Sequence, residues 1–198
     1  HAPSMAKLLN EKSRTVSFTT TGMTMKEFHK NILKSINRGL PERSALASLT
    51  THPAKICGAE KLCGTLETGK LANFFIVEGE TYFTENPAIH STWIQGRPFF
   101  HYPADNKKDS NSSKNPKEHT KRLAQFPPDL KKAVDSPPSV LFSGFKLWTC
   151  EDKSVLKNKD ILIENGKISK IGSNLKAKAP KGCKIVFGKG RHLTPGII

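Results

Sequence analysis

The sequence is short of acidic residues. It has 17 Asp and Glu against 32 Lys and Arg in 198 residues, which gives a formal net charge of +15. The hydrophobic fraction of 36% is low for a compact globule but well above that of a disordered chain, so we expect a packed core together with an unpacked stretch. The length of 198 residues corresponds to one domain or two small ones.

Long hydrophobic runs are also missing. The longest unbroken ones, such as Phe74 to Val77, are far shorter than the roughly 20 apolar residues that a membrane-spanning helix needs. This excludes a transmembrane helix, and we expect no membrane partner.

Cysteine is scarce, and the four cysteines make no CxxC pair and fall near no cluster of histidines. These spacings exclude zinc-ribbon and zinc-finger patterns. Buried free thiols are the simplest expectation. Four cysteines are too few to predict a cellular compartment. The four are Cys57, Cys63, Cys150 and Cys183.

The seven histidines are scattered, and no two have the HxH, HxxxH or HExxH spacing of metal ligands. We expect His29 to lie at the surface or boundary of a helix and His52, beside the helix-initiating Pro53, to be structural. No GxSxG nucleophile elbow occurs. The residues alone therefore assign no catalytic, cofactor-binding or metal-binding side chain.

The segment Gly64 to Leu71, with sequence GTLETGKL, fits the first seven positions of the phosphate-loop pattern GxxxxGK[ST]. It fails at the eighth, because Leu71 has no hydroxyl for magnesium. A strand-like segment, residues 72–77, follows where a phosphate loop needs a helix N-terminus. We therefore do not expect nucleotide binding.

Basic residues are concentrated in residues 139–198, where 12 Lys and Arg stand against 4 Asp and Glu, a net charge of +8. The net charge is +4 for residues 1–100 and +3 for residues 101–138. The lysines of the last segment occur singly among strand-like hydrophobics, without the interleaved aromatics that stack bases. This is typical of a solvated sheet surface. A basic β-rich module that binds nucleic acid or another polyanion is therefore the alternative function, not the leading one.

The first 59 residues have mainly helical patterns. Thr24 and Glu27 form a capping box before a helix, and Gly39 is placed to end it. Three further elements are expected in this part: a strand over Val16 to Thr20, a helix that starts at Pro41, and a short helix with Thr51 as its cap that ends at Gly58.

Strand patterns dominate the rest of the chain, apart from residues 101–138, which hold six of the 13 prolines and are expected to be a linker. The strongest local pattern is Asp160 to Ile168, two apolar strands joined by Asn165-Gly166, which favours a type I′ hairpin. Other strands are expected over residues 72–77, 91–94, 140–144 and 184–187.

Three segments of the first half resemble a known family. They are Ala45-Leu46 with Leu49-Thr50 and Pro53-Ala54, then Leu62 to Phe74, and finally Trp93-Ile94 with Gly96. In order and motif they resemble the C-terminal end of the metal-dependent amidohydrolases, most closely the imidazolonepropionase-like branch, over roughly residues 15–100. Asn73 stands where family members have Asp.

The second half resembles the opposite end of the same family. The matching segments are Val140 to Gly144, Asp160 to Ile168, Ile171-Gly172 and Leu193 to Ile198. The order is thus tail first and head second, which predicts the junction of two amidohydrolase units in one longer, tandem polypeptide. In family members the HxH metal ligands follow the last of these motifs, so we expect them after Ile198.

The resemblance implies a fold. Family members carry their metal in a (β/α)8 barrel, which is flanked by a β-sandwich built from N- and C-terminal strands. For this chain it implies a mainly β structure with an α-helical N-terminal part: a composite amidohydrolase β-sandwich beside a remnant of the last β/α unit of a TIM barrel. The expected boundaries are 1–59 for the barrel end, 60–100 for the C-terminal sandwich strands, 101–138 for the Pro/Lys-rich linker and 139–198 for the N-terminal strands of the following unit.

The resemblance also implies an activity for the parent, the hydrolysis of non-peptide carbon–nitrogen bonds in cyclic amides with divalent, zinc-like metal in the barrel. Family members place a metal-binding, water-activating Asp at the end of the last barrel strand, where this sequence has Thr19, Thr20 and Thr21. We therefore expect this chain alone to be inactive and to have no cofactor. Its expected partner is the rest of the parent polypeptide, with its amidohydrolase barrels.

The 38-residue linker is long enough to let the two groups of strands pair with each other, since a longer loop costs only slightly more to close. The alternative is that each half belongs with an absent barrel and leaves apolar edges exposed. In the composite sandwich, residues of the second half should face residues of the first half across one core. These residues are Ile161, Ile163 and Ile168 on one side and Phe74, Ile76 and Trp93 on the other.

Overall fold

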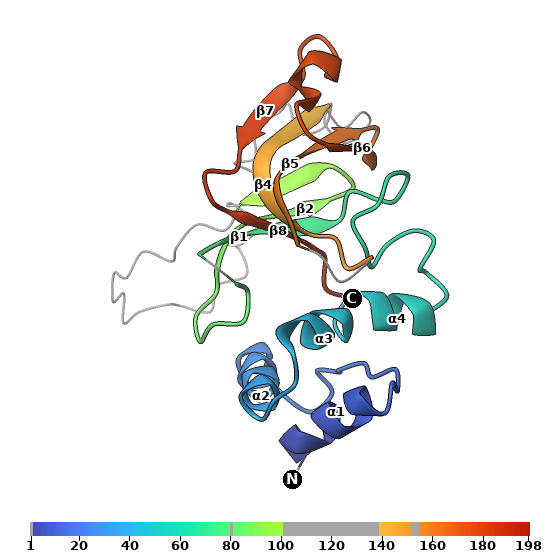
Figure 1. Cartoon of the computed structure of the whole chain (residues 1–198), viewed down its shortest axis with the longest axis vertical. Helices are drawn as coiled ribbons and strands as arrows, with labels where there is room; N and C mark the ends of the chain where they lie inside the picture. Colours follow the sequence, from blue (N-terminus) through green and yellow to red (C-terminus); the bar gives the residue numbers. More distant parts are fainter. Residues whose placement is uncertain (1, 80, 101–138, 152–154) are drawn as a thin grey trace, which may run out of the picture.

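The computed structural model describes residues 2–79, 81–100, 139–151 and 155–198. The predicted linker over residues 101–138 lies outside the described residues. Figure 1 shows helices at one end of the molecule and a strongly curved sheet at the other.

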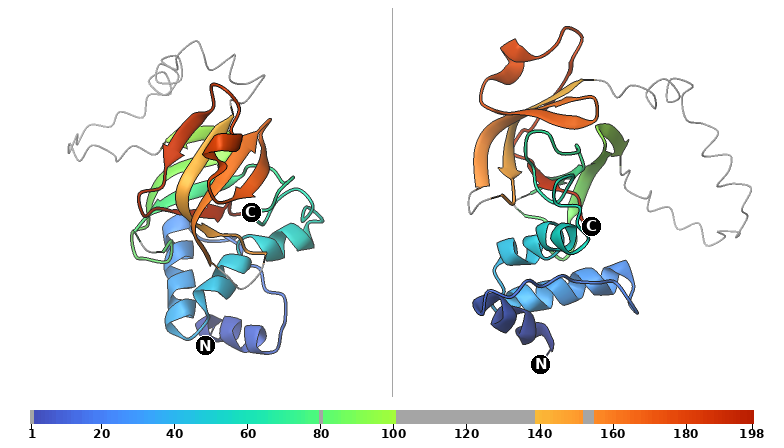
Figure 2. Two further views of the ribbon diagram at one scale, coloured as in Figure 1. Left: turned by 45° about the horizontal axis from the view of Figure 1, so that its top comes forward. Right: turned by 90° about the vertical axis from the view of Figure 1, so that its right-hand side faces the viewer.

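The described residues 2–79 include four α-helices. In Figure 1 and in the right-hand view of Figure 2, α3 and α4 lie between the α1–α2 pair and the sheet. The cap of α4 is Thr50, so Thr51, which we predicted as the cap, is instead its first residue. The four helices are α1 (Ala2–Glu11), α2 (Met25–Asn37), α3 (Glu42–Ala47) and α4 (Thr51–Ile56).

Both predicted ends of α2 are confirmed. The Glu27 amide donates to the Thr24 hydroxyl at 3.3 Å, and the Thr24 amide donates to the Glu27 carboxylate at 2.8 Å, which completes the capping box. At the other end Gly39 has φ +96°, and the Leu40 amide donates to the Ser35 carbonyl at 3.1 Å. This is a Schellman ending, which a glycine in the left-handed region favours.

The predicted strand over Val16 to Thr20 is wrong. Residues 14–20 have no regular secondary structure, and no strand of the described part of the chain pairs with them. The segment instead runs along the helices: the Phe18 amide donates to the Ser48 carbonyl at 3.3 Å, and His52 Nδ1 lies 2.7 Å from the Val16 carbonyl oxygen. A β-rich composition forms a strand only where a neighbouring strand can bond to it.

The strands belong to one mixed sheet in the order β3-β2-β1-β8-β4-β5-β6, with β7 pairing with β4. The mainly β character that we expected for this part is present, but as one continuous sheet and not as two separate ones. The elements are β1 (Phe74–Glu78), β2 (Ala88–Ile94), β3 (Arg97–Phe100), β4 (Val140–Trp148), β5 (Val155–Glu164), β6 (Lys167–Gly172), the 3₁₀ helix η1 (Leu175–Lys178), β7 (Lys184–Phe187) and β8 (His192–Pro195).

Strand β8 joins the two halves of the chain. It pairs antiparallel with β1, where Phe75 lies opposite Thr194, and parallel with β4, where Leu147 lies opposite Leu193. All four of its residues are buried. The resemblance of the second half includes Leu193 to Ile198, although Pro195 and the glycine that follows it are by themselves typical of a turn.

Strand β4 bends at Gly144, which has φ +73°. Its first half pairs with β7 and its second half with β8, both in parallel. The bend allows close backbone contact, since a Cβ atom on Gly188 would lie 2.4 Å from the Gly144 carbonyl oxygen. The buried Asp160 carboxylate holds the corner by accepting the Gly144 amide at 3.0 Å and the Leu175 amide at 2.8 Å.

Two tight hairpin turns lie against each other. Asn165 and Gly166, with φ values of +51° and +74°, confirm the predicted type I′ turn between β5 and β6. Gln95 and Gly96, with φ values of +49° and +76°, form the equivalent turn between β2 and β3. The turns touch, because a Cβ atom on Gly166 would lie 2.9 Å from the Gln95 carbonyl oxygen.

The sheet curls far enough for its faces to pack on each other. β2 and β4 are three strand spacings apart in the sheet order, which would be about 14 Å in a flat sheet. Yet the ring centroids of Trp93 on β2 and Phe142 on β4 are 4.8 Å apart. The curl also brings the segment before β1 against β6, where the Ala72 amide donates to the Gly166 carbonyl at 2.9 Å.

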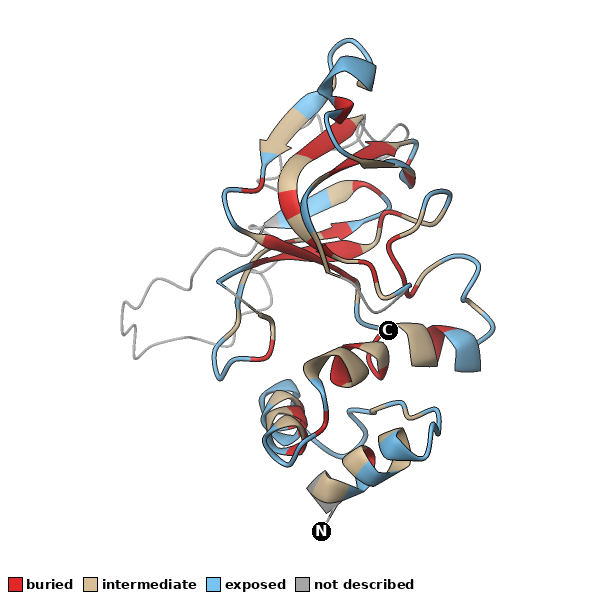
Figure 3. Cartoon of the chain, viewed as in Figure 1, coloured by how far each residue is buried: buried red, intermediate tan, exposed pale blue. Residues whose placement is uncertain are grey.

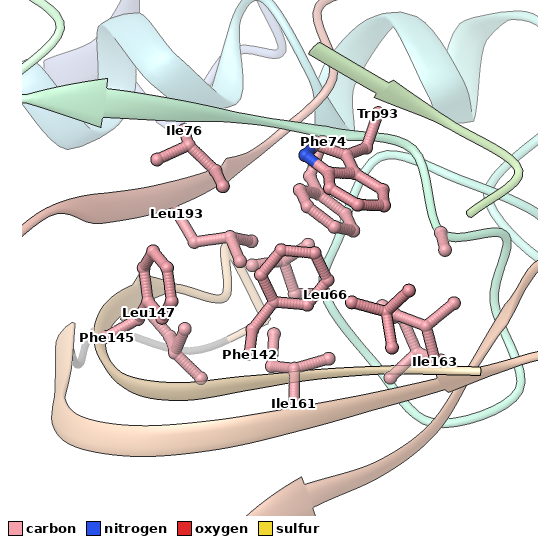
Figure 4. Packing of buried hydrophobic residues seen from close by; sticks show 13 residues of the cluster. Leu66, Phe74, Ile76, Trp93, Phe142, Phe145, Leu147, Ile161, Ile163 and Leu193 are labelled. Atoms are coloured by element: carbon pink, nitrogen blue, oxygen red, sulfur yellow. The ribbon is translucent and has the colours of Figure 1, made fainter. Parts of the chain in front are cut away.

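One buried cluster fills the space inside this curl. Figure 4 shows Phe74, Ile76 and Trp93 from one side meeting Phe142 and Ile161 from the other. Figure 3 shows the buried residues gathered along the strands, while the tip around η1 is exposed. The six residues that we expected to share a core all belong to this cluster: Ile161, Ile163, Ile168, Phe74, Ile76 and Trp93.

We expect Leu193→Ala to destabilise the whole sheet. Leu193 is 0% exposed and lies in the cluster between β1 and β4, so its truncation should lower the free energy of unfolding by about 2–5 kcal/mol. Urea unfolding followed by tryptophan fluorescence measures this loss. The control is Ile94→Ala on β2, where the side chain is 49% exposed and the loss should stay below about 1 kcal/mol. Equal losses in both variants would contradict the joining role of β8.

Candidate functional site

The segment over residues 64–71 is a loop whose charged side chains bind each other. Lys70 Nζ lies 2.9 Å from Glu67 Oε1 and also donates to the Thr65 hydroxyl, which in turn donates to Glu67. Strand β1 follows the loop, as we predicted for residues 72–77. A lysine held inside its own loop, with no helix N-terminus beside it, lacks the arrangement that cradles a phosphate.

This network shifts the acidity of Glu67. Burial disfavours the charged form and raises the pKa of Glu67, but hydrogen bonds from Thr65 and Lys70 and the positive charge of Lys70 outweigh burial. The pKa of Glu67 therefore lies below its ordinary value. The ionised carboxylate ties the loop together in the folded chain.

A hollow of about 360 Å³ lies beside this loop, lined in part by Glu67, Thr149 and Glu151. Two carboxylates could attract a cation there. Among residues 2–79, 81–100, 139–151 and 155–198, however, no three His, Cys, Asp or Glu side chains lie close enough together to hold a metal ion. The residues described here thus do not fit the divalent metal that the resemblance implies for the parent.

The three threonines at positions 19–21 form no site in the described structure. They are exposed, and the hydroxyls of Thr19 and Thr21 lie 2.8 Å from each other. A threonine hydroxyl is far too weak a base to take a proton from a metal-bound water at neutral pH. These three side chains therefore supply no group that could act as a general base.

The described histidines are dispersed over the molecule. His29 is half-buried, with its Nε2 2.6 Å from the Thr84 carbonyl oxygen, and His52 bonds to the 14–20 segment, so both have the structural roles that we predicted. His192 is buried on β8 and its Nδ1 accepts the Trp148 indole N–H at 2.8 Å. An Nδ1 that accepts this bond is unprotonated. Positions 1, 101 and 119 lie outside the described residues.

The four cysteines are all free thiols. Cys57 is exposed and the other three are half-buried, so our expectation of buried thiols is wrong for Cys57. The reason is that Cys57 caps the exposed end of α4. Burial raises the pKa of Cys150 to about 11, which keeps that thiol protonated and unreactive at neutral pH.

No helix in the described ranges is long and apolar enough to cross a membrane.

We expect Glu67→Gln to lower stability in a pH-dependent way. A lowered folded pKa means that the carboxylate contributes stability above its unfolded pKa of about 4.3 and loses it as the pH falls through the folded pKa. The variant should be less stable than the unsubstituted chain by about 0.5–1 kcal/mol at pH 7, and this difference in the free energy of unfolding should narrow between pH 5 and pH 3. Urea unfolding at these pH values measures it.

The control is Glu85→Gln, which removes the same charge from an exposed side chain. It should show no comparable gap at any of these pH values. A Glu67 gap that persists unchanged at pH 3 would contradict the electrostatic explanation.

Comparison with known proteins gives an independent view of the first half. A family model described as the amidohydrolase family matches residues 2–99. Among solved structures, an amidohydrolase from Thermotoga maritima MSB8 is 23% identical with a TM-score of 0.36, over 51% of this chain and 35% of that chain. The chain thus spans about a third of the length of that protein. No curated protein matches it. The family match covers the residues that carry the motifs noted above for the first half.

Proposed function

We propose that this chain is a non-catalytic β-sandwich segment of a tandem amidohydrolase, in which the end of one unit is followed by the beginning of the next. The parent would belong to the imidazolonepropionase-like branch and hydrolyse non-peptide carbon–nitrogen bonds in cyclic amides. The family match over residues 2–99 and the motif order in the two halves support this proposal.

The observation that carries the proposal is the insertion of β8 between β1 and β4. β1 follows the motifs that resemble the C-terminal end of an amidohydrolase, whereas β4 and β8 carry those that resemble the N-terminal end. Phe74 from the first group contacts Phe142 from the second with ring centroids 5.1 Å apart. The two groups can therefore bury each other's apolar faces without an intact barrel.

The inactivity of the segment rests on residue chemistry. Residues 19–21 lack a carboxylate, and the described side chains do not gather three metal ligands. In this proposal the metal belongs to the parent barrel, which also supplies the partner surface. The barrel end would then occupy residues 1–59, the two strand groups residues 60–100 and 139–198, and the linker residues 101–138.

We expect the isolated chain to bind no stoichiometric metal and to hydrolyse no cyclic amide. After expression in medium with added zinc and extensive dialysis, elemental analysis should find much less than one metal ion per chain. Hydantoin and dihydrouracil should remain intact in the presence of zinc or manganese, because no described residue group can position a metal-bound water. One metal per chain together with turnover of either substrate would contradict the proposal.

A second candidate function, polyanion binding, is favoured by one observation. Residues 165–198 contain eight Lys and Arg and no Asp or Glu. Around η1 four of these lysines are exposed, Lys176, Lys178, Lys181 and Lys184. Such a surface attracts nucleic acid or heparin through its charge alone.

Heparin chromatography separates the two functions. As a structural segment, the chain should elute from heparin below about 0.3 M NaCl, because scattered surface lysines release few counterions. The double variant Lys176→Gln with Lys178→Gln, which removes two positive charges, should elute at nearly the same NaCl concentration. Elution of the unsubstituted chain only above about 0.6 M NaCl, with elution of this variant at a clearly lower NaCl concentration, would favour polyanion binding instead.

A further inference from the structure

A second hollow lies on the outer side of the junction between the two halves. It has a volume of about 480 Å³, which is within the range of small-molecule sites. It forms where the end of β1, the middle of β4 and the turn between β7 and β8 meet. Its lining residues are Glu78, Gly79, Lys146, Lys189, Gly190 and Arg191.

The charges around this hollow do not cancel. Arg191 Nε and Nη2 both donate to Glu78 Oε1, at 3.2 and 3.0 Å, so this pair is largely neutral. Lys146 and Lys189 have no ion pair within the described ranges. The lining therefore carries two uncompensated ammonium groups beside an arginine that is already fixed in position.

These cations are placed by well-defined backbone. The Lys146 amide donates to the Arg191 carbonyl at 3.2 Å, which ties β4 to the start of β8. The Arg191 amide donates to the Gly188 carbonyl at 2.9 Å and closes a tight turn in which Lys189 and Gly190 have φ values of +47° and +86°. These bonds fix the positions from which the Lys146 and Lys189 side chains leave the backbone.

A neighbouring histidine adds no charge to the hollow at neutral pH. Burial and the positive charge of Arg191 lower the pKa of His90, and Glu78 opposes this only in part. Because the pKa lies below its ordinary value of 6.5, the ring is neutral at pH 7. The excess positive charge therefore comes from the two lysines.

We propose that this hollow binds a small phosphate-bearing anion, with Lys146 and Lys189 as its charge partners and Arg191 as an additional donor. A phosphate group offers several acceptor oxygens to donors that converge from different elements, and lysine ammonium groups bind it as point charges. Arg191 keeps its Nη1 for such a ligand, since its bonds to Glu78 use Nε and Nη2. The site is independent of the proposed amidohydrolase parent.

Titration of the full chain with inorganic phosphate at low ionic strength tests this site. Amide shifts in ¹H–¹⁵N spectra and thermal unfolding should both show saturable binding in the millimolar range. Lys146→Gln with Lys189→Gln should weaken binding about tenfold or more, because both unpaired charges are removed. Lys189→Arg, which keeps the charge, should bind phosphate with an affinity within a few-fold of that of the unsubstituted chain. Circular dichroism establishes that each variant is folded.

The matched control is Lys176→Gln with Lys178→Gln, which removes the same charge at the exposed η1 tip and should change phosphate affinity less than about twofold. Equal weakening in both double variants would overturn the site in favour of diffuse attraction. So would the absence of saturation at 20 mM phosphate. A single-stranded oligonucleotide provides the last comparison: affinity far above that for phosphate, with equal dependence on both lysine pairs, would indicate a polyanion surface and overturn the proposal.

Discussion

The fold depends on the pairing of β8 with β1 on one side and β4 on the other. Its backbone groups bond to both neighbours, and all four of its residues are buried. Without β8, β1 and β4 would each leave a row of backbone donors and acceptors unpaired beside the apolar core, which is costly. The strand is short, yet it holds together segments that lie almost 120 positions apart, such as Phe75 and Thr194. It is therefore the element that makes one sheet out of two groups of strands.

The corner in β4 is the second part of the same constraint. β7 and β8 share one edge of β4 in succession, so β4 must change direction between them. Gly144 permits the bend, Gly188 permits the close approach of the backbones, and the Asp160 carboxylate bonds to the amide at the bend. Because β8 then leaves at an angle to β7, the sheet curls, which brings Trp93 over Phe142. Strands that turn corners by bends are the usual way in which a sheet packs on itself.

The sequence predicted the features that depend on neighbouring residues. The capping box of α2 and the Asn165-Gly166 turn are complete within a few residues, and both are present. It failed where the outcome depends on distant partners. The 16–20 segment has strand composition but lies against helices, whereas β8 ends in Pro195 and still pairs on both sides. The strand that follows residues 64–71 was also predictable, because its β-rich composition is local. The hollow at Lys146 could not be foreseen, since its lining comes from three separate parts of the chain.

The junction that buries the core also produces the charge on its outer side. In β4 the buried Phe145 and Leu147 flank Lys146, so the alternation that points two side chains inward points the lysine outward. The parallel pairing with β8 then places Lys146 beside Arg191, and the turn before β8 adds Lys189. An anion held by these groups would contact β4 and the turn before β8, and Arg191 would connect it to Glu78 at the end of β1. By mass action such a ligand stabilises the folded state, so charge that disfavours a compact chain by itself becomes a source of stability.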